Sequence, residues 1–133
     1  MATIKRFEDI NAWQKARELA DNIYRLTKEN EFAKNFDLKN QINRSAGSIM
    51  DNIAEGFGRG GRKEFINFLG ISKGSLDELK SQLYRALDRN YIANDVFSNL
   101  YAQADEVGKM IAAFMAYLNK SDVDGEKFKN RAN

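Results

Sequence analysis

The residues best suited to catalysis are two glutamates, Glu55 and Glu78, each within a stretch of helical apolar spacing. If the two helices pack side by side, the carboxyl groups could act as a general acid and a general base. The chain has no histidine and no cysteine, which excludes imidazole bases, thiolate nucleophiles and Cys–His zinc sites. Since the sequence supplies no nucleophile and no metal cage, we predict no catalytic residue, no bound metal and no cofactor.

Glu55 belongs to a polar stripe on an otherwise weakly charged segment, residues 37–55, and this stripe could meet Ser72, Ser75 and Glu78 of the next helical segment. Its members recur every three or four residues, so they share one helix face, about 120° from the aliphatic stripe. Buried polar groups are best attested in setting helix register. We therefore predict a structural polar network that fixes helix register or subunit pairing, made by Gln41, Ser48, Asn52, Glu55, Ser75 and Glu78.

Next to this stripe lies a glycine-rich corner, residues 56–61, which reads G-F-G-R-G-G. It matches G-x-G-x-x-G by letter, but the dinucleotide fingerprint needs a strand before it, and here a helical pattern precedes it. Glycine accepts positive φ, so the corner lets the chain reverse. Basic side chains beside a helix N-terminus favour anion binding. We hypothesise nucleic-acid contact through Arg44, Arg59, Arg62 and Lys63, and the alternative is a solvated basic corner.

Four helical segments must position these groups. Apolar residues keep a three-four spacing over residues of about 10–29, 37–55, 62–89 and 94–119, and no proline interrupts them. The pattern predicts an all-α fold, an antiparallel up-down-up-down four-helix bundle over residues 1–120. Residues 121–133 have little apolar content, and we expect them to form a mobile C-terminal tail.

Several local features of the bundle can also be predicted. Asp37 is the expected N-cap of the second helix, and Phe32 and Phe36 are expected to cap the bundle end from a loop. Asn90 should end the third helix in a left-handed conformation. Two glycines one turn apart, at positions 70 and 74, predict the close approach of another helix.

The second and fourth helical segments carry few charges, even on the faces that a single core would leave exposed. A bundle needs only one apolar stripe per helix, so the remaining uncharged surface should face another protein surface. We predict that the partner is a second copy of the chain, in a symmetric homo-oligomer.

Composition limits the remaining possibilities. The chain has 133 residues, enough for one domain, with 21 basic and 19 acidic residues and a net charge of +2. That charge is mild for a dedicated nucleic-acid domain, so any such contact must come from local clustering or from symmetry. No apolar run approaches membrane length and no hydrophobic signal core opens the chain, so we predict a cytoplasmic protein without a membrane partner.

Several motifs together resemble one family. The runs SAGSIMDNIAEGFGR (residues 45–59), EFINFL (64–69), GSLDEL (74–79) and FEDINAWQKARELA (7–20) are similar to bacterial four-helix-bundle proteins encoded by 23S rRNA intervening sequences. The resemblance spans residues of about 7–118 and extends, in fold, to the accessory variability proteins of diversity-generating retroelements. It implies a ring of five subunits, and for the retroelement relatives it implies binding of nucleic acid and a reverse transcriptase.

These observations lead to one functional hypothesis and one alternative. The hypothesis is a non-enzymatic homo-oligomeric scaffold, most simply a pentamer, that contacts RNA or a nucleoprotein through the basic corner. The alternative is a purely protein-binding scaffold without nucleic-acid contact. An enzyme would require an enclosed pocket that contains both Glu55 and Glu78.

Overall fold

The predicted apolar periodicity forms four long helices in the computed structural model, which describes residues 4–120. They are accompanied by a 3-10 turn, η1, at Phe7–Asp9 and a short helix, α2, at Asn30–Lys34. No strand occurs within these residues, so the predicted all-α class is confirmed. The long helices are α1 (Asn11–Leu26), α3 (Phe36–Gly58), α4 (Arg62–Asp88) and α5 (Asn94–Lys120).

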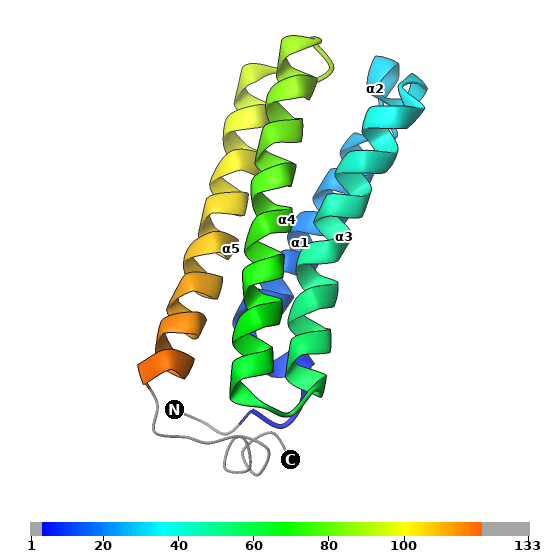
Figure 1. Cartoon of the computed structure of the whole chain (residues 1–133). Coiled ribbons are helices and arrows are strands. Elements are labelled where there is room, and N and C mark those ends of the chain that lie inside the picture. The colour runs from blue at the N-terminus through cyan, green and yellow to red at the C-terminus, as the bar shows by residue number, and fades with distance from the viewer. Residues whose placement is uncertain (1–3, 121–133) are drawn as a thin grey trace.

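The long helices lie side by side (Figure 1). α3 packs against α1 and α4, and α5 packs against α4 and α1, so each helix has two long neighbours. The contact between α3 and α4 is the most extensive of these. This contact brings the polar stripe of α3 against α4, and the basic corner connects the two helices at one end.

The core lies between the apolar stripes of all four helices. Phe65 of α4 is fully buried, and its ring centroid lies 5.2 Å from that of Phe114 on α5. Trp13 of α1 is also buried and packs edge-on against Phe7 at 5.0 Å. Other core residues are Ile10, Leu19, Ile23, Leu38, Ile42, Ile49, Ile53, Leu69, Leu76, Leu79, Leu83 and Ile111.

Close packing of α3 and α4 depends on Gly56. A Cβ at this position would lie 2.6 Å from the Cβ of Phe68 and 3.0 Å from a ring carbon of Phe65. Real Cβ atoms do not approach other atoms so closely, so only glycine lets the two helices meet here. Gly56 therefore lies in the contact between α3 and α4, although the sequence predicted it as part of the corner where the chain reverses.

The α3 N-terminus differs from the prediction. Asn35, not Asp37, is the N-cap, because its Oδ1 accepts a hydrogen bond from the Leu38 backbone N–H at 3.0 Å. α3 starts one residue earlier than predicted and continues to Gly58, three residues past the predicted end. Two of the corner glycines are thus helical, and the connection to α4 is only residues 59–61.

The segment before α3 is helical rather than a loop. Phe32 lies on α2, is fully buried and stacks on Tyr91 with centroids 5.3 Å apart. Phe36 is 70% exposed, so the prediction that both rings cap the bundle was wrong for Phe36. As the first residue of α3, Phe36 projects outward while Phe32 turns inward. Asn90 has φ of 61°, which confirms the left-handed end predicted for α4.

The glycines at positions 70 and 74 are not covered by another helix of this chain. A Cβ built at either position meets no atom within 4 Å beyond its own helix backbone and adjacent residues, within the described structure. The predicted close approach is therefore not made inside residues 4–120. The expected mobile tail, residues 121–133, lies outside the described residues. Among residues 4–120, no helix is long and apolar enough to cross a membrane.

Candidate functional site

The basic corner joins the end of α3 to the start of α4. Gly60 has φ of 81°, a conformation that glycine adopts freely, and Gly61 is the N-cap of α4. Arg59 is half exposed, with its guanidinium 5.2 Å from the Phe68 ring centroid and 3.8 Å from a Glu55 carboxylate oxygen. At that distance and exposure the ion pair is weak, and the guanidinium stays accessible from solvent.

The other two basic residues of the corner differ in their environment. Arg62 is half-buried, and its Nη1 donates a hydrogen bond to the Leu118 carbonyl oxygen at 3.3 Å. This bond links the start of α4 to the end of α5, where helix carbonyls lack partners within the helix. Lys63 is exposed and forms no hydrogen bond or ion pair with any described residue. The corner thus offers Lys63 and Arg59 to solvent, while Arg62 has a structural contact.

Arg44 lies away from this corner. It lies on α3 fifteen residues before Arg59, which directly follows that helix, so the two backbones are separated by about 22 Å. The structure therefore does not bring Arg44 together with Arg59, Arg62 and Lys63 within one chain.

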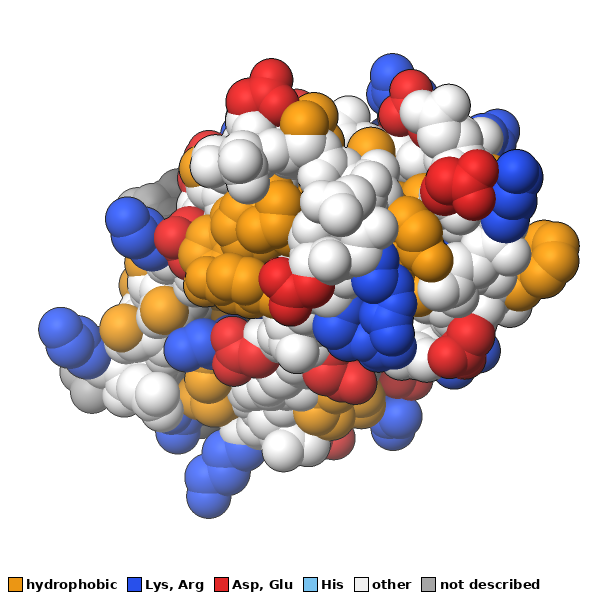
Figure 2. All heavy atoms as spheres, turned by 90° about the horizontal axis from the view of Figure 1, so that it is seen from above, with side chains coloured by type: hydrophobic (Ala, Val, Ile, Leu, Met, Phe, Trp, Pro, Cys, Tyr) orange, Lys and Arg blue, Asp and Glu red, His pale blue; other side chains and the backbone are white. Residues whose placement is uncertain are grey.

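Among the described residues, the opposite end of the bundle carries charges of both signs (Figure 2). Figure 2 views the molecule from above, at the end where α2 lies, and shows Lys and Arg side chains interspersed with Asp and Glu. Hydrophobic side chains lie between these charges. A mixed surface of this kind holds a phosphate chain less well than a patch of one sign.

The polar stripe forms a hydrogen-bonded contact between α3 and α4. The hydroxyls of Ser48 and Ser75 lie 2.8 Å apart, and Asn52 Nδ2 donates to the Ser48 carbonyl at 2.8 Å and to its hydroxyl at 2.9 Å. One turn along, Ser72 donates to the Ile49 carbonyl at 2.8 Å. The bonds of Ser48 and Ser72 join α3 to α4, those of Asn52 lie within α3, and together they satisfy polar groups in the helix contact.

Near the α2 end, the contact continues through Gln41, whose Oε1 accepts from Arg85 Nη1 at 3.1 Å. Since Ser48 meets Ser75 and Gln41 meets Arg85, positions rise along α4 as they fall along α3. The sequence indicated Ser72 as a residue that the polar stripe could meet, but it did not indicate Arg85.

Glu55 and Glu78 lie outside this network, contrary to the prediction. Glu55 is exposed and pairs only with Arg59 among the described residues. Glu78 is exposed and forms no hydrogen bond or ion pair with residues 4–120. Both sit at the rim of the helix contact, where water solvates the carboxylate and avoids the cost of burying it. They line different grooves.

A groove of about 440 Å³ runs along the outer side of the α3–α4 contact, and we call it the α3–α4 groove. Gln82 lies at its base, 7% exposed, and its Oε1 has no hydrogen-bond partner among the described residues. The sequence analysis missed this residue, although it lies seven positions after Ser75 and so shares its helix face. The lining residues are Asp37, Gln41, Arg44, Ser45, Ser48, Ser75, Glu78 and Gln82.

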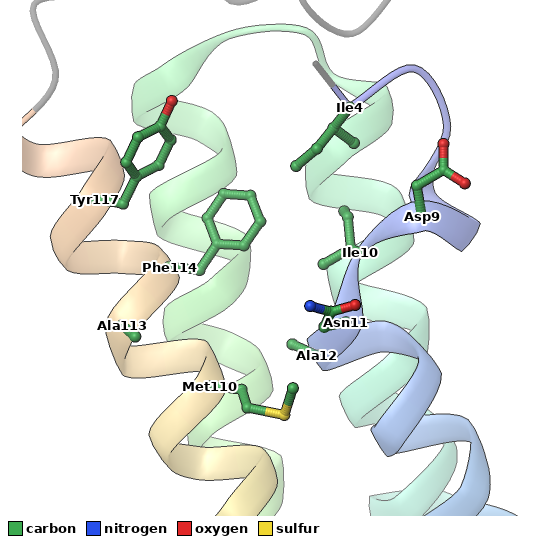
Figure 3. Close-up of a pocket in the computed structure, with 9 residues that line it drawn as sticks. All are labelled: Ile4, Asp9, Ile10, Asn11, Ala12, Met110, Ala113, Phe114 and Tyr117. Atoms are coloured by element: carbon green, nitrogen blue, oxygen red, sulfur yellow. The ribbon is translucent and has the colours of Figure 1, made fainter. Parts of the chain in front are cut away.

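A second groove, of about 410 Å³, is mainly apolar and lies between the start of α1 and the end of α5. Figure 3 shows Met110 and Phe114 of α5 facing Ile4 and Ile10 across it. The groove contains one carboxylate, Asp9, and no basic side chain. No group of three or more acidic side chains that could hold a metal ion occurs in the described part of the chain.

Comparison with known proteins gives a family and a solved relative. The family model of the 23S rRNA-intervening sequence proteins matches residues 8–113. A crystal structure of a Bacteroides thetaiotaomicron protein of unknown function, from the S23 ribosomal protein family, is 28% identical with a TM-score of 0.71. The match covers 78% of this chain and 97% of that one. No curated protein gives a significant match.

Proposed function

Because this chain belongs to the family of 23S rRNA-intervening sequence proteins, as its motifs indicated, we propose that it is a non-enzymatic scaffold built by self-association. In this proposal the four long helices form an up-down-up-down bundle. Five copies assemble into a ring that contacts RNA or a nucleoprotein.

The observation that supports self-association is a face of α4 that no other described helix covers. Gly70 and Gly74 each cost about 1 kcal/mol of helix stability relative to alanine, yet no helix of the described chain uses the space they leave. Ile71, between them, is 45% exposed. A second copy that packs here would bury this isoleucine and approach the α4 backbone closely.

The test is the mass of the protein in solution and its response to bulk on this face. Light scattering coupled to size exclusion should give a discrete species well above the 15.2 kDa monomer. Gly74→Gln should shift it toward monomer while circular dichroism stays helical, because nothing in the described chain opposes the new side chain. The control is Lys73→Gln, a change to the same residue one position away, on another helix face. A monomeric parent would refute self-association, and a dimeric parent would refute the ring.

RNA contact is supported by the corner of Arg59 and Lys63. Both side chains are accessible and lie beside the first turn of α4, whose N–H groups favour a phosphate. One mildly basic chain should bind weakly, but a ring repeats the corner and gains avidity. The family's name also connects these proteins with 23S rRNA.

Fluorescence anisotropy of labelled RNA across a salt series tests this contact. Arg59→Glu combined with Lys63→Glu should abolish binding, and affinity of the parent should fall steeply with salt. This pair leaves Arg62 and its bond to α5 intact. Arg17→Glu with Arg25→Glu, on α1, is the control with the same charge change. If only the α1 variant lost binding, the RNA site would lie on α1 and not at the corner. If the parent did not bind RNA, the purely protein-binding scaffold would be favoured.

A further inference from the structure

The α3–α4 groove contains a buried acceptor that the chain itself leaves without a donor. Gln82 is 93% buried, and its Oε1 has no hydrogen-bond partner among residues 4–120. Burying a carbonyl oxygen without a donor is costly, and native proteins keep few such atoms. We propose that the groove binds the guanidinium group of an arginine side chain on a partner protein, which supplies that donor.

The charges around Gln82 favour a positively charged donor. The groove also contains the carboxylates of Asp37 and Glu78, both exposed and neither in an ion pair with a described residue. Glu78 lies one helix turn before Gln82, on the same side of α4, so one ligand can reach both. Arg44 is the single basic residue of the lining, which leaves the groove with a net charge of −1.

The groove's own neighbouring arginines do not fill this role. Arg85 donates to Gln41 at 3.1 Å and is not among the groove's lining residues. Arg44 lines the groove but forms no hydrogen bond or ion pair with Gln82 or Glu78. The carboxylates of Asp37 and Glu78 are therefore open to a donor from another molecule, whereas the buried Gln82 Oε1 is reached when the Gln82 side chain turns into the groove.

A guanidinium suits this set of acceptors better than an ammonium or a phosphate. It presents five N–H donors in a planar fork, so it can bind an amide oxygen and a carboxylate together. An ammonium offers three donors from one point. A phosphate has only acceptors, which Gln82 Oε1 and the two carboxylates repel, so this groove is separate from the proposed RNA contact.

The surroundings of the groove favour a protein as the source of the arginine. Gly47 lies next to Ser48 in an adjoining groove, and a Cβ built there meets no described atom within 4 Å beyond its own helix backbone and adjacent residues. A partner's backbone can therefore come close to α3 while its arginine side chain enters between α3 and α4.

The test uses a fluorescein-labelled peptide, acetyl-Gly-Arg-Gly-amide, added to the full-length protein and followed by anisotropy. The comparison peptide carries citrulline in place of arginine, which keeps the shape and removes the charge. We expect saturable binding of the arginine peptide and at least about ten-fold weaker binding of the citrulline peptide, the usual value of a hydrogen bond to a charged group.

Two variants place the binding in the groove. Glu78→Gln and Gln82→Met should each weaken arginine-peptide binding about ten-fold. Glu106→Gln, an exposed glutamate on α5 outside the groove, should leave it unchanged. Equal binding of a lysine peptide would overturn the preference for guanidinium. The protein-binding groove would be refuted if the arginine peptide did not bind or if Glu78→Gln bound it as well as the parent does. It would also be refuted if Gln82→Met lowered the affinity for RNA.

Discussion

The sharpest prediction concerns the same substitution at two glutamines that line one groove. Gln82→Met removes an acceptor oxygen that has no partner in the described structure. Gln41→Met removes an acceptor that takes a hydrogen bond from Arg85 at 3.1 Å. Methionine resembles glutamine in length and in helix propensity, so the hydrogen-bonding state is the main difference between the sites.

The two variants should change stability in opposite directions. A buried unsatisfied polar group costs about 1–3 kcal/mol, so Gln82→Met should raise the free energy of unfolding by at least about 1 kcal/mol. At the half-buried Gln41, loss of the bond should lower it by about 1 kcal/mol. The expected difference between the variants is therefore about 2 kcal/mol.

Urea unfolding followed by helical circular dichroism measures this difference. All samples must be at one protein concentration, because the stability of an oligomer depends on it. Equal m-values would show that the substitutions act on stability and not on the size of the unfolding unit. If Gln82→Met destabilises the protein as much as Gln41→Met, Gln82 Oε1 has a donor in the folded state and the reasoning is wrong.

Three further predictions follow from individual contacts. Gly56→Ala should destabilise the protein by about 1–2 kcal/mol, because the 2.6 Å contact with Phe68 costs more than the gain in helix propensity. Gly58→Ala is the control, since this position lies in open space on the same helix and should not be destabilised. Thermal melts compare the two variants. Glu55→Ala should change the free energy of unfolding by less than about 0.5 kcal/mol, because the only ion pair of this exposed side chain among the described residues is 3.8 Å long. A larger decrease of the unfolding free energy in urea would indicate that Glu55 has a buried role. Lys80 donates a hydrogen bond to the Asp105 carboxylate, which raises the pKa of Lys80 above its ordinary 10.5. The stabilisation from this bond is complete below pH 10.5 and is lost as the pH rises through the higher folded-state pKa. The free energies of unfolding of the parent and of Lys80→Met, measured on either side of pH 10.5, should therefore converge at high pH, and a constant difference would contradict the assignment.

The family and the helical class could be predicted from the sequence because both depend on local patterns. The motif around residues 45–59 identifies the family, and the three-four spacing of apolar residues identifies the long helices. Asn90 could be recognised because an asparagine at the end of a helical pattern readily adopts positive φ. Each of these features requires only residues near in sequence.

The position of each polar residue relative to the neighbouring helix could not be read in this way. A stripe gives the angle of Glu55 and Ser48 around α3, but the rotation of α3 against α4 decides which of them is buried. In the structure Ser48 meets Ser75, while Glu55 and Glu78 fall at the solvent rim. The same rotation buries Gln82 without a partner.

Sequence alone thus determined which residues form helices and which side of each helix is apolar, since a helix repeats every 3.6 residues wherever it lies. Tertiary structure decided which glycine is a contact and which polar atom is left unpaired. Gly56 meets Phe68, and Gly74 meets nothing in the described chain, although both are helical glycines. The reason is that these properties belong to pairs of helices, and the distance and rotation between two helices depend on the packing of the whole core.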